Sequence, residues 1–250
     1  MEKKSIKKVV AFDFDDTLAI TDSLVGVRSV SNTDLSKVFA DHGIKPARET
    51  GGWTCIDSRS YEILLSTGGA FLSDLEFDYT ETMSVDLENI IPIEAMIRNM
   101  RQHLADPEVL VIVLTARAGY AEVWSDMNQH FVSARNRQGI SAFLNSQGII
   151  IPEHHIHTVG DVAAEGGSTS VAKADVLAHY AMLHKPLQIV LYDDSQRNID
   201  QVQNINRRFK TGCEIVTNHV EEGVVTEVIS SKDKKGLKQW FYSILKTMLE

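Results

Sequence analysis

The sequence predicts an α/β protein whose core is a doubly wound, Rossmann-like parallel sheet, with a small insertion or cap after the first strand. Three observations lead to this prediction. Short β-branched apolar runs recur along the chain, segments with helical periodicity separate them, and one long segment near the N-terminus interrupts the alternation. Strands that alternate with helices form right-handed βαβ units, which build a parallel sheet covered on both faces.

Five apolar runs are candidates for strands of this sheet. Residues 9–12, 109–114 and 187–192 are nearly continuous in their apolar side chains. Strands buried on both faces have this pattern, whereas strands with one solvent-facing side alternate. Residues 155–159 and 213–217 are the two other candidates. Because the active sites of such sheets lie beyond the carboxyl ends of the strands, we expect the functional residues directly after these runs.

Four segments between the apolar runs have apolar side chains at helical spacing, which predicts amphipathic helices. In the first segment, Ile93, Ile97 and Leu104 share one helical face. The four predicted helices are residues 93–104, 120–144, 171–183 and 199–209.

Residues 25–89 do not follow the alternation of strands and helices. The segment contains paired glycines, which break regular structure, and two candidate strands at residues 61–65 and 75–79. A loop of this length without regular structure is uncommon in a compact domain, so we expect a small cap. The predicted boundaries are 1–24 and 90–230 for the core, 25–89 for the cap, and 231–250 for a C-terminal amphipathic helix.

The composition is that of a globular protein, because 43% of the 250 residues are hydrophobic and 24% are charged. The net charge of −9 counts against broad electrostatic binding to the phosphate backbone of nucleic acids. The two cysteines lie far apart in the sequence, which suits a reducing compartment. Carboxylates interrupt the apolar run near the N-terminus, unlike in a signal peptide, and no stretch has the length of a membrane span. We expect a cytoplasmic protein without a membrane partner.

Polar residues of a particular kind follow the three continuous runs. If these runs are parallel strands, their carboxyl ends meet at one edge of the sheet and bring several carboxylates together. Such carboxylates repel one another, and a divalent cation that prefers oxygen ligands, such as Mg²⁺, would relieve the repulsion. The residues are Asp13, Asp15 and Asp16 after the first run, Thr115 and Arg117 after the second, and Asp193 and Asp194 after the third.

The spacing of Asp13 and Asp15 suits two different chemical roles. Asp13 would attack phosphorus and form an aspartyl phosphate. Asp15 would protonate the leaving oxygen and later remove a proton from water. A bound Mg²⁺ would shield the negative phosphate from Asp13. Thr115 would donate a hydrogen bond to a phosphoryl oxygen, and Lys173, which follows a Gly- and Ser-rich stretch at the start of a helix, would add positive charge.

Local explanations compete for several of these residues. Lys185 and Lys210 are alternatives to Lys173, but Lys185 precedes the third run and therefore lies at the amino end of that strand. A single aspartate such as Asp13 is most simply a helix N-cap, and Arg117 could belong to the start of the next helix. The agreement among three strand ends favours a catalytic site over these explanations.

Two other classes of aspartate-rich site fit the sequence less well. An EF-hand loop that started at Asp13 would need Gly and Glu where Leu18 and Leu24 stand. A receiver domain has its acidic pair after the first strand, whereas the pair Asp193-Asp194 follows the last of the three continuous runs.

The order of the motifs resembles that of the haloacid dehalogenase (HAD) superfamily of phosphohydrolases across residues 8–216. Its four motifs fall on the DxDxT sequence at residues 13–17, on Thr115, on Lys173 and on Asp193-Asp194. The resemblance implies a HAD-like fold and a Mg²⁺ cofactor.

The same resemblance implies a set of metal ligands. Asp13 would bind the metal as well as act as the nucleophile, and Asp15 would bind through its backbone carbonyl. Asp193 would bind the metal directly, and Asp194 would act through a water molecule.

A narrower resemblance concerns Thr115-Ala116-Arg117 together with residues 192–199. These stretches look like those of uncharacterised phage and bacterial HAD proteins near the polynucleotide 3′-phosphatases. The resemblance implies that Arg117 contacts the substrate phosphate or the leaving group. We also expect Asp16 to contact the substrate.

These observations predict a Mg²⁺-dependent phosphomonoester hydrolase that acts on a small phosphorylated substrate such as a nucleotide. Three alternatives stay open. A polynucleotide 3′-phosphatase acting on nucleic-acid ends would need a basic groove around Arg117, Arg135 and Arg137. A phosphotransferase or mutase would use the same nucleophile but protect it from water. A non-catalytic binding module would lack Mg²⁺ binding.

Overall fold

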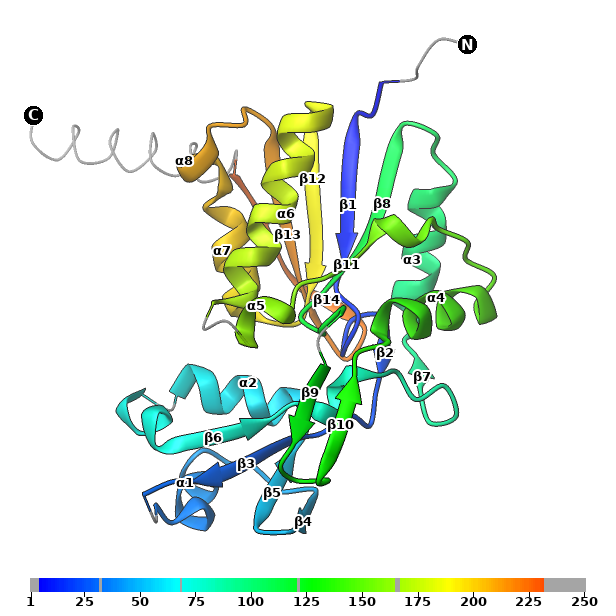
Figure 1. Cartoon of the computed structure of the whole chain (residues 1–250). Coiled ribbons are helices and arrows are strands. Elements are labelled where there is room, and N and C mark those ends of the chain that lie inside the picture. Colours follow the sequence, from blue (N-terminus) through cyan, green and yellow to red (C-terminus); the bar gives the residue numbers. More distant parts are fainter. Residues whose placement is uncertain (1–4, 32, 68, 121, 165–166, 232–250) are drawn as a thin grey trace, which may run out of the picture.

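The computed structural model describes residues 5–31, 33–67, 69–120, 122–164 and 167–231. The core strands are β1 (Lys8–Phe12), β8 (Val109–Thr115), β11 (Ile156–Thr158), β12 (Gln188–Asp193), β13 (Glu214–Glu221) and β14 (Val224–Ser230). They form a six-stranded sheet in the order β11-β8-β1-β12-β13-β14 (Figure 1). Neighbouring strands are parallel except for β13 and β14, which are antiparallel.

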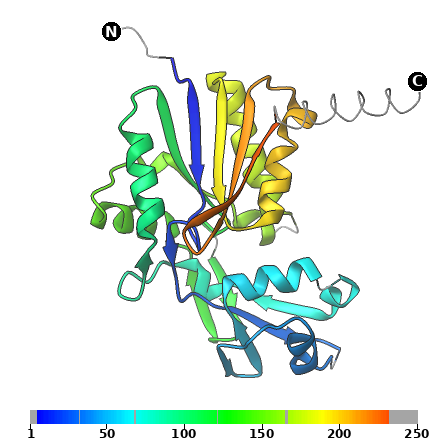
Figure 2. The ribbon, with the colours of Figure 1, turned by 180° about the vertical axis from the view of Figure 1, so that it is seen from behind.

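Helices cover both faces of this sheet. They are α3 (Glu94–Leu104), α4 (Asn136–Ser146), α5 (Asp161–Ala164), α6 (Thr169–His184), α7 (Gln196–Gln203) and α8 (Ile205–Phe209). The side chains of β1 alternate between the faces: Val10 and Phe12 pack in one cluster with α3 and α4, and Val9 and Ala11 pack in another with α6. Figure 1 shows α6 in front of the strands, and Figure 2 shows α3 in front. The predicted doubly wound, Rossmann-like fold is therefore confirmed.

A second, smaller layer lies beyond the carboxyl ends of the core strands (Figure 1). Its strands are β3 (Val25–Ser29), β4 (Arg48–Thr50), β5 (Trp53–Ile56) and β6 (Leu75–Asp78). They form an antiparallel sheet in the order β4-β5-β3-β6, and α1 (Leu35–Asp41) and α2 (Ser58–Thr67) accompany it. Its apolar cluster, built around Val27, Phe39 and Leu64, is separate from the two clusters of the core. We call this layer the cap.

The chain passes between core and cap through two neighbouring segments. On the outward path it forms β2 (Ala19–Ile20), and on the return path it forms β7 (Ile91–Pro92), which pairs with β2 in antiparallel fashion. Short 3₁₀ helices at Gly69–Asp74, Thr80–Met83 and Glu153–His155 complete the irregular segments.

Most elements of the core agree with the sequence. All five strand candidates are strands, and the helices expected at residues 93–104 and 171–183 are α3 and α6. The helix expected at residues 199–209 is divided into α7 and α8, which meet at Asn204. The candidate strand at residues 75–79 is β6.

The candidate strand at residues 61–65 is wrong, because these residues lie within α2. Asp57 accepts a hydrogen bond from the backbone N–H of Ser60 at 2.7 Å, in the manner of a helix N-cap. Ser60 and Leu64, one helical turn apart, are both buried. The apolar run at residues 63–65 therefore belongs to one side of a helix rather than to a buried strand.

The single helix predicted over residues 120–144 is wrong in its first half. A hairpin of β9 (Glu122–Ser125) and β10 (His130–Ser133) precedes α4. Trp124 and Phe131 form a cross-strand pair with ring centroids 5.2 Å apart. The Asp78 carboxylate of the cap accepts hydrogen bonds from the Ser125 hydroxyl and the Met127 backbone N–H, each at 3.1 Å. These tertiary contacts stabilise a hairpin where periodicity alone indicates a helix.

Two expectations concern the ends of the chain and the membrane. The C-terminal amphipathic helix was placed at residues 231–250, and residues 232–250 lie outside the described part of the chain. Within the described ranges, no helix combines the length and the apolar character that crossing a membrane requires.

Candidate active site

Three carboxylates come together where two neighbouring strands of the core end. Asp13 directly follows β1, Asp193 is the last residue of β12, and Asp194 comes next. Because β1 and β12 are adjacent and parallel, their ends coincide, and the backbone N–H of Asp13 donates to the Tyr192 carbonyl at 2.9 Å. Oxygen atoms of the three carboxylates lie within 4.8 Å of one another. The sequence predicted this group, which we call the carboxylate cluster.

Lys173 lies against the carboxylate cluster from α6. Its Nζ is 2.9 Å from both Asp13 Oδ1 and Asp193 Oδ2, and its side chain is fully buried. Burial disfavours the charge, but the two carboxylates outweigh it and raise the pKa of Lys173 above its usual value. The alternative Lys185 lies at the far end of α6, just before β12, and Lys210 follows α8. The structure thus brings Lys173 to the site, as predicted.

The carboxylate cluster has more negative than positive charge. Burial and the neighbouring Asp193 and Asp15 carboxylates raise the pKa of Asp13 to about 7, although Lys173 acts in the opposite direction. Burial and the adjacent carboxylates also place the pKa of Asp194 well above its usual range. A divalent cation would relieve this repulsion, and carboxylate oxygens are the donors that a hard cation prefers. The three residues therefore fit a metal ion.

The Asp15 side chain is not part of the carboxylate cluster. Its carboxylate accepts hydrogen bonds from Arg117 Nε at 2.9 Å and Arg117 Nη2 at 2.7 Å, and from the Thr21 hydroxyl at 2.7 Å. Burial alone would favour the neutral acid, but the Arg117 guanidinium outweighs burial and lowers the pKa of Asp15. Asp15 is therefore held as an anion in this arrangement. The structure leaves open its predicted metal contact, which would be made through the backbone carbonyl.

Arg117 connects Asp15 to both segments that lead into the cap. Besides Asp15, its guanidinium donates to the Ser23 hydroxyl at 2.9 Å and to the backbone carbonyls of Thr82 and Ser84 at 3.1 and 3.0 Å. All three of its nitrogens thus have partners, and the side chain is buried. The contact of Arg117 with a substrate stays a prediction. The geometry favours a structural role, in which Arg117 holds Asp15 and the two cap connections together.

Thr115 and Asp16, the other predicted residues, face different neighbours. Thr115 ends β8, is fully buried, and accepts the Arg117 backbone N–H at 3.2 Å through its hydroxyl oxygen. Thr115 is not among the residues that line the cavity, so its hydrogen bond to a phosphoryl oxygen stays a prediction. Asp16 has a left-handed backbone with φ of 55°, and its carboxylate accepts a hydrogen bond from Ser58 at the start of α2. The role of Asp16 in substrate binding stays a prediction.

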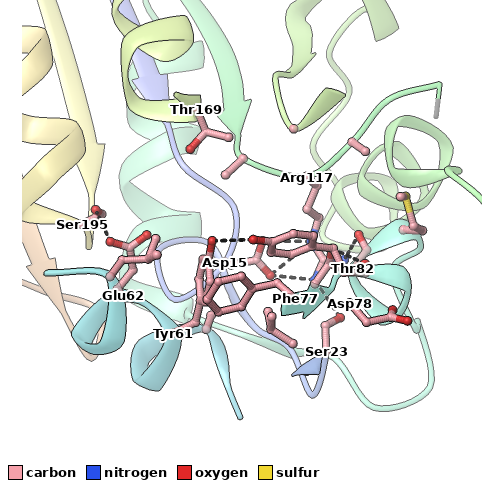
Figure 3. Close-up of a pocket in the computed structure, with 18 of the residues that line it drawn as sticks. Asp15, Ser23, Tyr61, Glu62, Phe77, Asp78, Thr82, Arg117, Thr169 and Ser195 are labelled. Carbon is pink, nitrogen blue, oxygen red and sulfur yellow. Dashed lines mark hydrogen bonds and ion pairs between the residues drawn. The ribbon is translucent and has the colours of Figure 1, made fainter. Parts of the chain in front are cut away.

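A cavity of about 540 Å³ lies between the core and the cap (Figure 3). On the core side, Asp13, Asp194 and Lys173 contribute to its lining. The cap and the β9–β10 hairpin contribute five aromatic side chains. They are Trp53, Tyr61, Phe77, Tyr79 and Trp124. The carboxylate cluster therefore opens onto a space large enough for a substrate rather than only a phosphate ion.

A hydrogen bond joins the cap to the loop after β12. The Ser195 hydroxyl donates to Glu62 Oε2 of α2 at 3.1 Å, directly beside Asp193 and Asp194 (Figure 3). Burial raises the pKa of Glu62, although the bond from Ser195 lowers it. The sequence did not single out Glu62 or Ser195, because no local pattern signals a contact between residues 133 positions apart.

Trp53 has two kinds of surroundings, since it packs with Cys55 and Met127 and also lines the cavity.

Comparisons with known proteins carry no argument about function. No protein-family model and no curated protein matches the chain. Among solved structures, the chain is similar to the HAD domain of effector protein Lem4 from Legionella pneumophila, with 10% identity and a TM-score of 0.37 over 98% of this chain and 96% of that chain. A similarity at this level does not assign the chain to a family, so function has to be argued from the site.

Proposed function

We propose that the protein is a Mg²⁺-dependent phosphomonoester hydrolase of the HAD type that acts through an aspartyl phosphate on Asp13. One observation carries the proposal. Asp13, Asp193, Asp194 and Lys173 converge at the carboxyl ends of two parallel strands, and Asp13, Asp194 and Lys173 line a cavity. Two buried acids and a buried lysine in contact are costly to keep for stability alone, which supports a functional role.

The residues have the following roles in this proposal. An oxygen of Asp13 attacks phosphorus, the bond from phosphorus to the leaving oxygen breaks, and an aspartyl phosphate forms. Lys173 holds Asp13 and Asp193 in place, and Thr115 donates a hydrogen bond to a phosphoryl oxygen. Asp13, Asp193 and Asp194 would hold Mg²⁺, which would supply positive charge at the phosphate.

Asp15 moves the protons. It protonates the leaving oxygen, and it then takes a proton from the water molecule that attacks phosphorus and releases phosphate from Asp13. In the arrangement described, Asp15 is ionised and held by Arg117. Asp15 already lines the cavity, but to act as an acid it has to gain a proton. A shift of the cap that loosens the contacts of Arg117 with Ser23, Thr82 and Ser84 would weaken its hold on Asp15 and permit protonation.

The alternatives gain no specific support. A nucleic-acid end-processing role needs free arginines at the cavity. Arg117 is buried against Asp15 and Arg137 stacks on Tyr120, which leaves Arg197 as the exposed arginine of the cavity lining. In the cap, Arg28 and Arg48 form ion pairs with glutamates. No contact distinguishes a transferase or mutase from a hydrolase.

The test is phosphate release from a panel of monophosphates, with Mg²⁺ and with a chelator. Asp13→Asn is expected to lower Mg²⁺-dependent release more than about 10³-fold, because the nucleophile is lost. Asp175→Asn is the matched control, since Asp175 lies on the same helix as Lys173 but is exposed and pairs with Arg208. The proposal would be wrong if Asp13→Asn kept full activity, or if the wild type released phosphate equally fast with Mg²⁺ and with a chelator.

A further inference from the structure

Three aromatic rings in mutual contact line the cap side of the cavity, together with polar side chains such as Glu62 and Thr80. Tyr61 meets Phe77 and Tyr79 edge-on, with ring centroids 5.5 and 5.8 Å apart, and Phe77 stacks on Tyr79 at 6.0 Å. All three side chains are half-buried and line the cavity. Figure 3 shows Tyr61 and Phe77 on the cap side, with Arg117 and Thr169 on the core side. We call Tyr61, Phe77 and Tyr79 the aromatic wall.

The aromatic wall lies opposite the charged groups that would handle phosphate. The carboxylate cluster and Lys173 belong to the core, whereas the wall belongs to α2 and to the segment that contains β6. Trp124 of the hairpin adds a further ring to the lining, and 48% of its side chain is exposed. A substrate whose phosphate reaches Asp13 therefore places its leaving group against aromatic rings.

The aromatic wall carries two polar groups, which bond to each other. The hydroxyls of Tyr61 and Tyr79 are 2.9 Å apart, so one of their two hydrogens remains to be donated to a substrate. Lys173 and Arg117 are both held by carboxylates. Arg197, the other arginine that lines the cavity, is exposed and is the cation that a second phosphate group would meet.

We propose that the aromatic wall binds a planar aromatic ring in the leaving group of the substrate, as in a nucleoside monophosphate or an aryl-bearing alkyl phosphate. This inference rests on the proposed function. The cavity volume of about 540 Å³ accommodates a phosphate together with a ring system. Aromatic rings that stack on aromatic side chains, or that meet them edge-on, gain more affinity than the buried area alone provides. Phe77 and its neighbours therefore set the specificity for the leaving group.

The first test compares substrates that differ only in the ring. Adenosine 5′-monophosphate is compared with ribose 5-phosphate, and benzyl phosphate with cyclohexylmethyl phosphate, because each pair keeps a primary alkyl leaving oxygen. We expect kcat/KM to be at least about tenfold higher for the aromatic member of one pair. The pair that shows the preference tells a nucleobase from a simple aryl ring. Equal kcat/KM values within both pairs would overturn the inference. So would a preference for phosphocholine, because the wall would then serve a quaternary ammonium group.

The second test removes one ring of the aromatic wall. Phe77→Leu is expected to lower the aromatic preference about three- to tenfold, while the ring-free substrates keep their kcat/KM. Phe71→Leu is the matched control, because Phe71 packs on the same apolar cluster of the cap but does not line the cavity. An equal loss of preference in both variants would mean that cap stability, not ring contact, is responsible, and it would contradict the inference.

Binding separates this inference from the proposed function. Calorimetry on Asp13→Asn compares adenosine 5′-monophosphate with ribose 5-phosphate, and benzyl phosphate with cyclohexylmethyl phosphate. If the wild-type protein releases no phosphate from any substrate, but the aromatic members bind more tightly to Asp13→Asn, the proposed function fails and the aromatic site stands. If the wild-type protein releases phosphate without any aromatic preference in turnover or binding, the function stands and the aromatic site fails.

Discussion

The core and the cap contribute opposite kinds of surface to the same cavity. The core presents buried charges, with Asp13, Asp193 and Lys173 in direct contact. The cap presents half-buried aromatic rings, with Tyr61, Phe77 and Tyr79 in contact with one another. Charged groups are held by hydrogen bonds and ion pairs of defined direction, whereas contacts between aromatic rings tolerate changes in the relative position of the rings.

This difference indicates a division of labour. The core arrangement leaves little freedom, because Asp193 alone accepts bonds from Lys173, the Ser195 backbone N–H and the Asn198 amide. Such a network is suited to chemistry that requires fixed distances. The cap arrangement is suited to choosing a leaving group. The predictions below test whether the two regions are as separable as this comparison suggests.

The largest effect is expected from the core. Lys173→Met leaves the buried carboxylates of Asp13 and Asp193 without their cation, and it should lower the free energy of unfolding by about 3–5 kcal/mol at neutral pH. Urea denaturation without added metal measures this change. Activity should fall in parallel, and Asp175→Asn again serves as the control. If Lys173→Met were as stable as the wild type within error, the buried charges of the core would not depend on one another. The contrast between core and cap would then be wrong.

An intermediate effect is expected where core and cap meet. Arg117→Lys keeps the positive charge but loses the two-pronged contact with Asp15 and the bonds to Thr82 and Ser84. We expect stability to fall by about 1–3 kcal/mol and kcat to fall at least about tenfold. An additional change in the pH profile of kcat would show that Arg117 acts through the proton of Asp15. A loss of stability with an unchanged kcat would instead assign Arg117 to the cap connections alone.

The smallest effect is expected on the cap side. Because burial raises the folded-state pKa of Glu62, its contribution to stability is fully present below its usual pKa and is lost as pH rises through the raised value. Glu62→Gln keeps an acceptor for Ser195 without the charge. The variant should equal the wild type at pH 4 and exceed it by about 1 kcal/mol at pH 8. Thermal unfolding across this range checks the result, and a constant difference at all pH values would contradict it.

The core site could be predicted from the sequence because sheet geometry does most of the placement. Once three apolar runs are parallel strands, Asp13, Thr115 and Asp193 must lie at one edge. Lys173 followed from its position at the start of a helix on the correct side of the sheet. These inferences need only the order and direction of the strands.

The remaining features depend on contacts between distant segments. Arg117 reaches Asp15 across 102 positions of sequence, and Ser195 reaches Glu62 across 133. The hairpin at residues 122–133 exists because Asp78 binds Ser125 and Met127. No local periodicity contains this information, so the predicted helix at residues 120–144 failed in the half that touches the cap.

The β9–β10 hairpin limits how the cap can be exchanged between related proteins. Two separate stretches of sequence contribute to the layer beyond the core, since Met127 of the hairpin completes the small cluster around Trp53 and Cys55 of the cap. A graft that transfers only residues 25–89 to a related scaffold would leave Trp53 without Met127, and Asp78 without Ser125 and Met127. The layer can be inherited, exchanged or engineered as a unit only when both stretches travel together.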